Sequence, residues 1–157
     1  MFLVVMALTA IDQVSKWLVE TRLPFQQTVE LIPFLSLHRT HNEGIAFSLL
    51  AWAGNFGLIV LALLVMGFML YLWSKVRPDQ QLAHLGFAFV LGGALGNLID
   101  RIVESHVIDF ILVHTSTWAF AVFNFADAFI TIGAIAIIID ELFSIKADRN
   151  AAKTQSD

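Results

Sequence analysis

No cysteine occurs among the 157 residues of the chain, so disulfide bonds and thiolate catalysis are excluded. Charged residues are also few: they make up 14% of the sequence, whereas soluble domains contain about 25%. Hydrophobic residues make up 58%, and a soluble chain of this length would leave too much of that apolar surface in water. The composition therefore indicates a membrane protein with several spans.

Missing motifs exclude several further kinds of function. The net charge is −4, and no basic stripe is present that would neutralise the phosphates of a nucleic acid. The sequence contains no phosphate-binding glycine motif, no nucleophile elbow and no HExxH metal frame. His38 and His41 are three residues apart, but without such a frame we predict neither a metal ion nor a cofactor.

Four segments are apolar enough to form membrane helices, which need about 20 residues each. We predict a single membrane domain at 1–145, with helices at about 1–19, 56–74, 82–100 and 118–142, outer loops at 20–55 and 101–117, and a polar tail at 146–157. The first helix is the weakest, because Asp12 and Lys16 interrupt it. A cleaved signal peptide is the alternative for this segment, but it lacks a charged n-region and a good cleavage site before Asp12.

Lysine and arginine residues predict the orientation of these helices, because short cytoplasmic loops are enriched in them. Arg22 and Arg39 lie in the loop on one side, with Lys16 and Arg101 near the adjoining helix ends. The other side has five such residues: Lys75, Arg77, Lys146, Arg149 and Lys153. We therefore expect both termini in the cytoplasm and the loops 20–55 and 101–117 at the outer face.

The outer loops are expected to contain some regular structure. Residues 28–37 alternate in part and are rich in β-prone residues, which predicts a short sheet on the membrane surface. Residues 103–114 also alternate in part, and 44–50 are apolar enough for a short interfacial helix. The expected fold is therefore an all-α integral membrane protein with four helices, a small β element and a short interfacial helix on the outer side.

Two aspartates lie where a carboxylate is costly. Asp127 is the only charged residue in the run 118–139, and Asp109 interrupts the apolar run 107–111. A charge at membrane depth costs roughly 2.5–3.5 kcal/mol on insertion scales, so such a residue is a functional candidate. If the third helix ends near Asp100 at the outer surface, the chain can fold back and place Asp109 close to Asp127.

Two carboxylates at hydrogen-bond distance share one proton and titrate as a pair. One of them can then take a proton from water while the other protonates or polarises a carbonyl. This is the chemistry of aspartic proteases.

Other polar residues share helix faces. Asp12 and Lys16 are four residues apart, so they form either a structural ion pair or a contact to a substrate. Asn124 and Asp127 also share a face, which suggests a carboxylate held by hydrogen bonds in a partly dry site. Three more residues form one stripe at the end of the third helix, where the group can satisfy itself: Asn97, Asp100 and Arg101.

Five short motifs resemble, in order and spacing, those of the lipoprotein signal peptidases, also called type II signal peptidases. They are Asp12-Gln13-Val14-Ser15-Lys16, Asn42-Glu43-Gly44-Ile45-Ala46-Phe47, the stretch from Gly92 to Arg101, Val107-Ile108-Asp109-Phe110 and Phe123-Asn124-Phe125-Ala126-Asp127. Each motif alone is weak, but five in order are highly specific.

The resemblance implies a bacterial inner-membrane aspartyl endopeptidase that cuts prolipoproteins just before a cysteine carrying a diacylglyceryl group. Carried over by motif, the catalytic pair is Asp109 and Asp127, and Asp100 is a supporting residue. The resemblance also implies residues that line or shape the substrate site: Asp12, Lys16, Asn42, Gly44, Asn97, Arg101, Asn124 and Ala126. The implied partners are diacylglyceryl-modified prolipoproteins, membrane lipids and the inhibitor globomycin.

Two other functions stay open from the sequence. A small transport or proton-relay protein also uses intramembrane Asp, Asn and Arg. A transporter site, however, is expected near the midplane and between repeats. Here the polar residues collect toward one face and no repeat is visible. The second alternative is an assembly factor whose ion pairs only fix helix packing.

Overall fold

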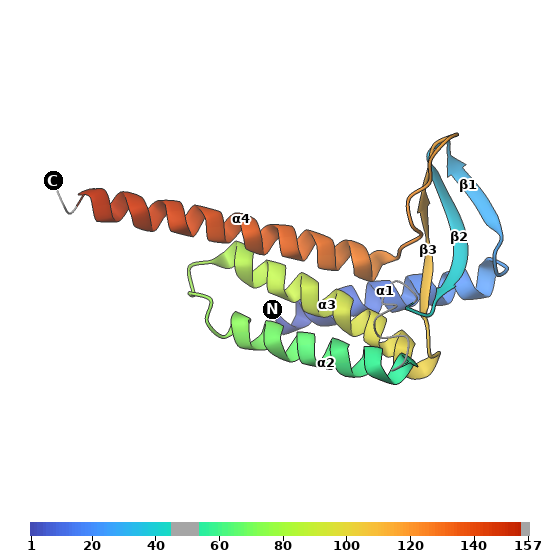
Figure 1. Cartoon of the computed structure of the whole chain (residues 1–157), viewed down its shortest axis with the longest axis horizontal. Coiled ribbons are helices and arrows are strands. Elements are labelled where there is room, and N and C mark those ends of the chain that lie inside the picture. Colours follow the sequence, from blue (N-terminus) through green and yellow to red (C-terminus); the bar gives the residue numbers. More distant parts are fainter. Residues whose placement is uncertain (45–53, 155–157) are drawn as a thin grey trace.

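The computed structural model describes residues 1–44 and 54–154 and contains, in this part of the chain, four helices and one small sheet (Figure 1). The helices are α1 (Phe2–Arg22), α2 (Gly54–Trp73), α3 (Gln81–Val103) and α4 (Phe125–Thr154). Each is long and apolar enough to cross a bilayer. The strands are β1 (Thr28–Ile32), β2 (Leu35–Asn42) and β3 (Val107–Val113), antiparallel in the order β1-β2-β3. The predicted combination of four membrane helices and a small β element is confirmed.

Helix α3 lies at the centre of the bundle and packs against α1, α2 and α4 (Figure 1). Its small residues explain this position, because Gly92 lies against α1 and Gly93 against α4 with no room for a side chain between the helices. Helix α2 is different: against the rest of the described chain it buries only Leu58. With no charged residue on any face, α2 can expose its remaining side chains to lipid.

The sheet stands at one end of the helices, with its strands running across the helix direction (Figure 1). Val19 of α1 and Leu23, the residue after this helix, pack against Phe110 of β3 in a small buried cluster. Arg39 of β2 ties the sheet to the end of α1, since its guanidinium pairs with Glu20 at 2.8 Å and donates to the carbonyl oxygen of Leu23 at 3.4 Å. Such donors satisfy the last carbonyls of a helix.

The fourth helix begins at Phe125, seven residues later than the predicted start at 118. Residues before it run along β3 instead, where Phe123 and Ile111 exchange two backbone hydrogen bonds of 2.8 and 3.0 Å, and Ala119 pairs with His114. This segment covers the outer edge of β3, which would otherwise leave unpaired backbone groups. An apolar run of this length does not distinguish a helix from extended chain.

Two further predictions concern segment ends. The segment after 145, predicted as a polar tail, continues α4 as far as Thr154. The predicted interfacial helix at 44–50 falls almost entirely outside the described residues. Helix α1 begins, and the described part of α4 ends, on the side of the molecule away from the sheet (Figure 1).

Candidate active site

Asp109 and Asp127 meet at Asn124, the residue that precedes α4. The side-chain amide of Asn124 donates to Oδ1 of Asp109 at 2.6 Å, and its backbone N–H donates to Oδ2 of Asp127 at 3.2 Å. Asn124 is fully buried, and Asp109 is 2% exposed. The two aspartates belong to different elements, Asp109 to β3 and Asp127 to α4, and the fold brings both into contact with the same asparagine.

Asn124 also starts α4. Its Oδ1 accepts the backbone N–H of Asp127 at 3.0 Å, while the Asp127 carboxylate accepts the N–H of Asn124. This reciprocal pair is a capping box, which satisfies two of the N–H groups that a helix start leaves free. A carboxylate in the first turn also interacts favourably with the helix dipole. The local sequence Asn-x-x-Asp thus begins the helix and fixes the Asp127 side chain.

Asn42 holds the other oxygen of Asp109. Its Oδ1 accepts the N–H of Gly44 at 2.9 Å, so its Nδ2 faces Asp109 Oδ2 and donates to it at 3.0 Å. Thr40 stands opposite Asp109 in the β2–β3 register, which places Asn42 diagonally on the same face of the sheet. Gly44 has φ +84°, and a Cβ there would overlap Leu58, so only glycine fits this turn.

Asn97 of α3 holds Asp127 in the same way. Its Oδ1 accepts a proton of the Lys16 ammonium at 2.9 Å, and its Nδ2 donates to Asp127 Oδ1 at 2.9 Å. Because an ammonium group can only donate, the amide oxygen of Asn97 has to face Lys16 and the amide nitrogen has to face Asp127. The four carboxylate oxygens of Asp109 and Asp127 each receive a donor, and each keeps one lone pair for a proton or for water.

Lys16 is itself buried, at 2% exposure, among acceptors from two helices. Its Nζ lies 2.7 Å from Asp12 and 2.7 Å from Asp100, in addition to its bond to Asn97. These three acceptors match the three protons of an ammonium group. Asn97 therefore links the ion pairs of Lys16 to Asp127 by hydrogen bonds on both sides of its side-chain amide.

Asp12 and Asp100 extend this network to the remaining elements. Asp12 Oδ1 accepts the backbone N–H of Ala126, a free donor of the first turn of α4, at 2.9 Å. Asp100 Oδ2 accepts the N–H of Ile108 in β3 at 3.3 Å. Gly96 allows the close approach, since a Cβ at that position would overlap the Asp12 carboxylate. Helices α1, α3 and α4 and strand β3 are thus joined around one buried cluster.

Gln13 is a member of the cluster that the sequence analysis missed. Its side-chain amide donates to Asp100 Oδ1 at 2.6 Å and to the Gly96 carbonyl at 3.1 Å. The signal was present in the sequence: four polar residues of α1 recur at helical spacing on one face, namely Thr9, Asp12, Gln13 and Lys16.

Arg101 differs from the self-contained stripe expected for it. Asp100 pairs with Lys16 instead, and Arg101 Nη1 is buried without a hydrogen-bond partner in the described part of the chain. Arg101 lines a cavity of about 310 Å³ together with Asn42, Asn97 and Asp127. A guanidinium can donate to the carbonyl or carboxylate of a ligand.

This cavity, the candidate catalytic cavity, lies between α2, α3 and α4, and its other walls are apolar, with Leu58, Val65 and Ile130 among them. A second cavity of about 360 Å³ reaches Asp127 from the side of Phe120 and Phe123. Apolar walls with a few convergent polar groups are typical of ligand sites. Asp127 can therefore be reached by an apolar chain on either side.

Burial raises the pKa of Asp109 from its ordinary value to about 6. Hydrogen bonds from Asn42 and Asn124 act in the opposite direction and lower this pKa, while the neighbouring charge of Asp127 raises it further. The Asp109 carboxyl thus exchanges its proton close to physiological pH, as a general acid needs to do.

A protein-family model and similar known proteins both indicate the same family. Residues 4–143 match the family model described as signal peptidase (SPase) II. Proteins named lipoprotein signal peptidase from Brucella ovis and Brucella canis are each 53% identical to this chain over 149 residues, which are 95% of this chain and 92% of each relative.

Two solved structures of bacterial membrane enzymes, determined by the in meso method, have similar folds. The first, at 1.9 Å resolution, has a TM-score of 0.78 and 29% identity, and the match covers 90% of this chain and 91% of that one. The second, at 2.3 Å resolution, has a TM-score of 0.80 and 28% identity, and the match covers 92% of this chain and 88% of that one.

Proposed function

Because the chain belongs to the signal peptidase II family, we propose that it removes the signal peptide from diacylglyceryl-modified prolipoproteins by aspartic catalysis. The cut precedes the lipidated cysteine. Membership of this family makes the protein a membrane-bound protease. The aspartic mechanism, the site of cleavage and the roles of individual residues are parts of the proposal.

The observation that carries the proposal is the meeting of Asp109 and Asp127 at Asn124. Each carboxylate is held by two amide donors, and Asp127 borders a cavity with apolar walls. Asp109 is buried while Asp127 is half-buried. The neutral form is favoured at the more buried position. Of the two carboxyl groups, Asp109 is therefore the acid and Asp127 the base.

The reaction follows from these protonation states. Asp127 takes a proton from water as the water oxygen attacks the scissile carbonyl carbon, and Asp109 gives its proton to the carbonyl oxygen. The tetrahedral intermediate collapses when Asp127 returns its proton to the leaving nitrogen and Asp109 recovers its own. No step requires a metal ion or another cofactor.

The remaining site residues position the substrate and the two aspartates. Arg101 donates to a carbonyl of the bound peptide. Asn42 and Gly44 contact the backbone of this peptide next to that carbonyl. The helices and strand that hold Asp109 and Asp127 are fixed by five further residues: Lys16, Asp12, Asp100, Asn97 and Ala126. The acyl chains of the substrate remain in the lipid, which anchors the substrate and raises its local concentration.

The proposed location is the bacterial inner membrane, with both termini in the cytoplasm and the active site toward the periplasm. The Lys and Arg residues near the ends of α2 and α4 support this orientation. Globomycin is expected to bind in the same cavity as the substrate. The network lies at the sheet end of the bundle rather than along its length, which favours a peptidase over the alternative of a proton relay or transporter.

Cleavage of a synthetic prolipoprotein peptide tests the proposal. The purified protein should cut the peptide that carries a diacylglyceryl cysteine, at the bond before that cysteine, and should leave the same peptide without lipid uncut. Mass spectrometry of the products identifies the bond. Equal cleavage of both peptides, or of neither, would contradict the proposed substrate class.

The pH dependence of kcat/KM tests the assignment of the proton. Because Asp109 has to be protonated in the free enzyme, kcat/KM should fall as pH rises through about 6, the pKa of Asp109. Asn42→Ala removes a hydrogen bond that lowers this pKa, so the falling limb should move to higher pH. Thr28→Val, which removes only an exposed bond to His38, should leave the limb in place. A limb that Asn42→Ala does not move would assign it to another group.

A further inference from the structure

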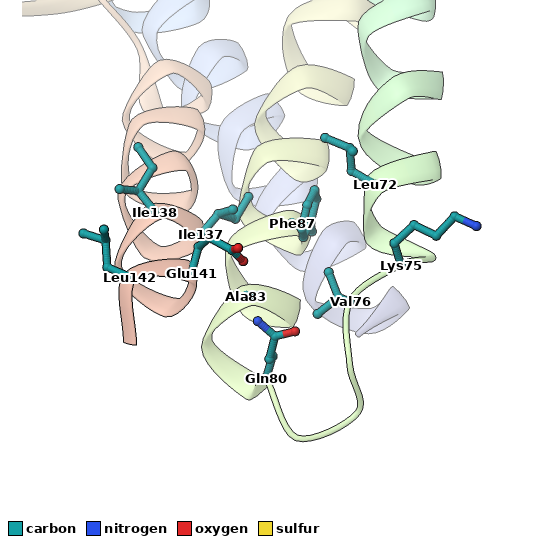
Figure 2. Close-up of a pocket in the computed structure, with 10 residues that line it drawn as sticks. All are labelled: Leu72, Lys75, Val76, Gln80, Ala83, Phe87, Ile137, Ile138, Glu141 and Leu142. Atoms are coloured by element: carbon teal, nitrogen blue, oxygen red, sulfur yellow. The ribbon is translucent and has the colours of Figure 1, made fainter. Parts of the chain in front are cut away.

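A third cavity lies at the end of the helices away from the sheet. It has a volume of about 430 Å³ and is formed by the end of α2, the start of α3 and the second half of α4. Its lining is mostly apolar, and Figure 2 shows Ile137 of α4 pointing toward Phe87 of α3, with Gln80 at the start of α3. Nothing in the proposed chemistry uses this part of the molecule.

This distal cavity lies on the same helix faces as the catalytic cavity. On each of the three helices, one residue of the catalytic cavity and one of the distal cavity are seven positions apart, which is two turns. The pairs are Val65 and Leu72 on α2, Ala94 and Phe87 on α3, and Ile130 and Ile137 on α4. The two cavities therefore lie in line along α3, between α2 and α4. The line from one cavity to the other is called the groove below.

The length of the groove follows from the helix that forms its side. From Asp127 to Glu141 is 14 residues of α4, or about 21 Å at the helical rise. A signal peptide has an apolar region of about 7–15 residues preceded by a positively charged region. An apolar helix at the long end of that range, about 14 residues, spans the roughly 21 Å from a peptide bond at Asp127 to the distal cavity.

The charges around the distal cavity also favour a signal peptide as its ligand. The Glu141 carboxylate points from α4 toward α3, into the distal cavity (Figure 2). Lys75 borders the cavity but points away from it, and its ammonium lies 5.3 Å from the ring of Tyr71 (Figure 2). The charged group that an occupant meets is therefore negative, which suits the basic region of a signal peptide.

We propose that the distal cavity binds the start of the substrate's signal peptide, with Glu141 facing its basic residues while the scissile bond lies at Asp127. The inference rests on the proposed function and its orientation. The groove would then contribute to substrate specificity, because the enzyme would recognise the basic residues at the start of the signal peptide as well as the lipid at its end.

A charge swap tests the contact. With a prolipoprotein whose n-region carries lysines, Glu141→Lys should raise KM by about two- to tenfold without lowering kcat, and a substrate with glutamates there should reverse the preference. Asp79→Lys makes the same charge change in the loop after α2, outside the cavity, and should affect both substrates equally. If Glu141→Lys also affects both equally, the contact is absent. Failure of the wild type to cut either substrate would instead contradict the proposed function.

Disulfide cross-linking tests the position, because the chain contains no cysteine of its own. In the Asp127→Asn background, Ile138→Cys should cross-link to a cysteine placed at the start of the substrate's apolar region. Ile139→Cys, one residue further and about 100° around the helix, should not. Equal cross-linking at both positions, or cross-linking only at Ile139, would overturn the proposed path.

Discussion

Replacing Asp109 or Asp127 by asparagine should lower cleavage of a lipidated prolipoprotein by about a hundredfold to ten-thousandfold, the range that a general acid or base contributes. An amide can neither accept the proton of water nor return one to the leaving nitrogen. The measurement is kcat/KM on the lipidated peptide with purified variants. Asp79→Asn makes the same change in the exposed loop after α2, where the carboxylate lies 3.6 Å from Arg77, and should change kcat/KM by less than about twofold.

The structure also predicts how well these variants fold. Both oxygens of Asp109 accept from amide groups, so the side-chain amide introduced by Asp109→Asn would set one of its own donors against a donor. The cost of one such mismatch is about 1–3 kcal/mol, which leaves a folded protein. Thermal unfolding in detergent separates this loss from catalysis. Full activity of either variant would rule out the aspartate pair, and inactivity that only accompanies unfolding would favour the assembly-factor alternative.

Lys16→Met should lower the free energy of unfolding by about 3–5 kcal/mol, because it leaves two buried carboxylates without their cation. Asp12 and Asp100 each lie 2.7 Å from the ammonium and are almost fully buried. Thermal unfolding in detergent measures the loss. Lys75→Met removes an exposed lysine at the other end of the bundle and should change the free energy of unfolding by less than about 0.5 kcal/mol.

A second variant separates the loss of charge from the loss of packing. Adding Asp12→Asn to Lys16→Met removes one of the two unpaired charges, and the asparagine oxygen can still accept the N–H of Ala126, so the double variant should recover part of the lost stability. If the double variant is less stable than Lys16→Met, the two carboxylates do not depend on Lys16 for their charge. The single variant should also lower kcat, because Lys16 orients the Asn97 side chain that holds Asp127.

Much of the fold could be predicted because the membrane imposes a simple rule. Spanning segments need about 20 apolar residues, and four runs in the sequence have nearly that length. The start of α4 could not be predicted from hydrophobicity, since residues 118–124 are apolar whether they form helix or cover the edge of β3. The capping residues Asn124 and Asp127 were the better signal, because their spacing satisfies a helix start wherever the hydrophobic run begins.

The sequence by itself determined the class of protein and singled out Asp109 and Asp127, because a carboxylate in apolar surroundings is costly whatever surrounds it in space. The tertiary structure decided which groups neutralise and orient these carboxylates. Spacing suggested Arg101 as a partner for Asp100, yet the cation that pairs with Asp100 is Lys16 from another helix. Ion pairing depends on distance through space, and only the packing of α1 against α3 sets that distance.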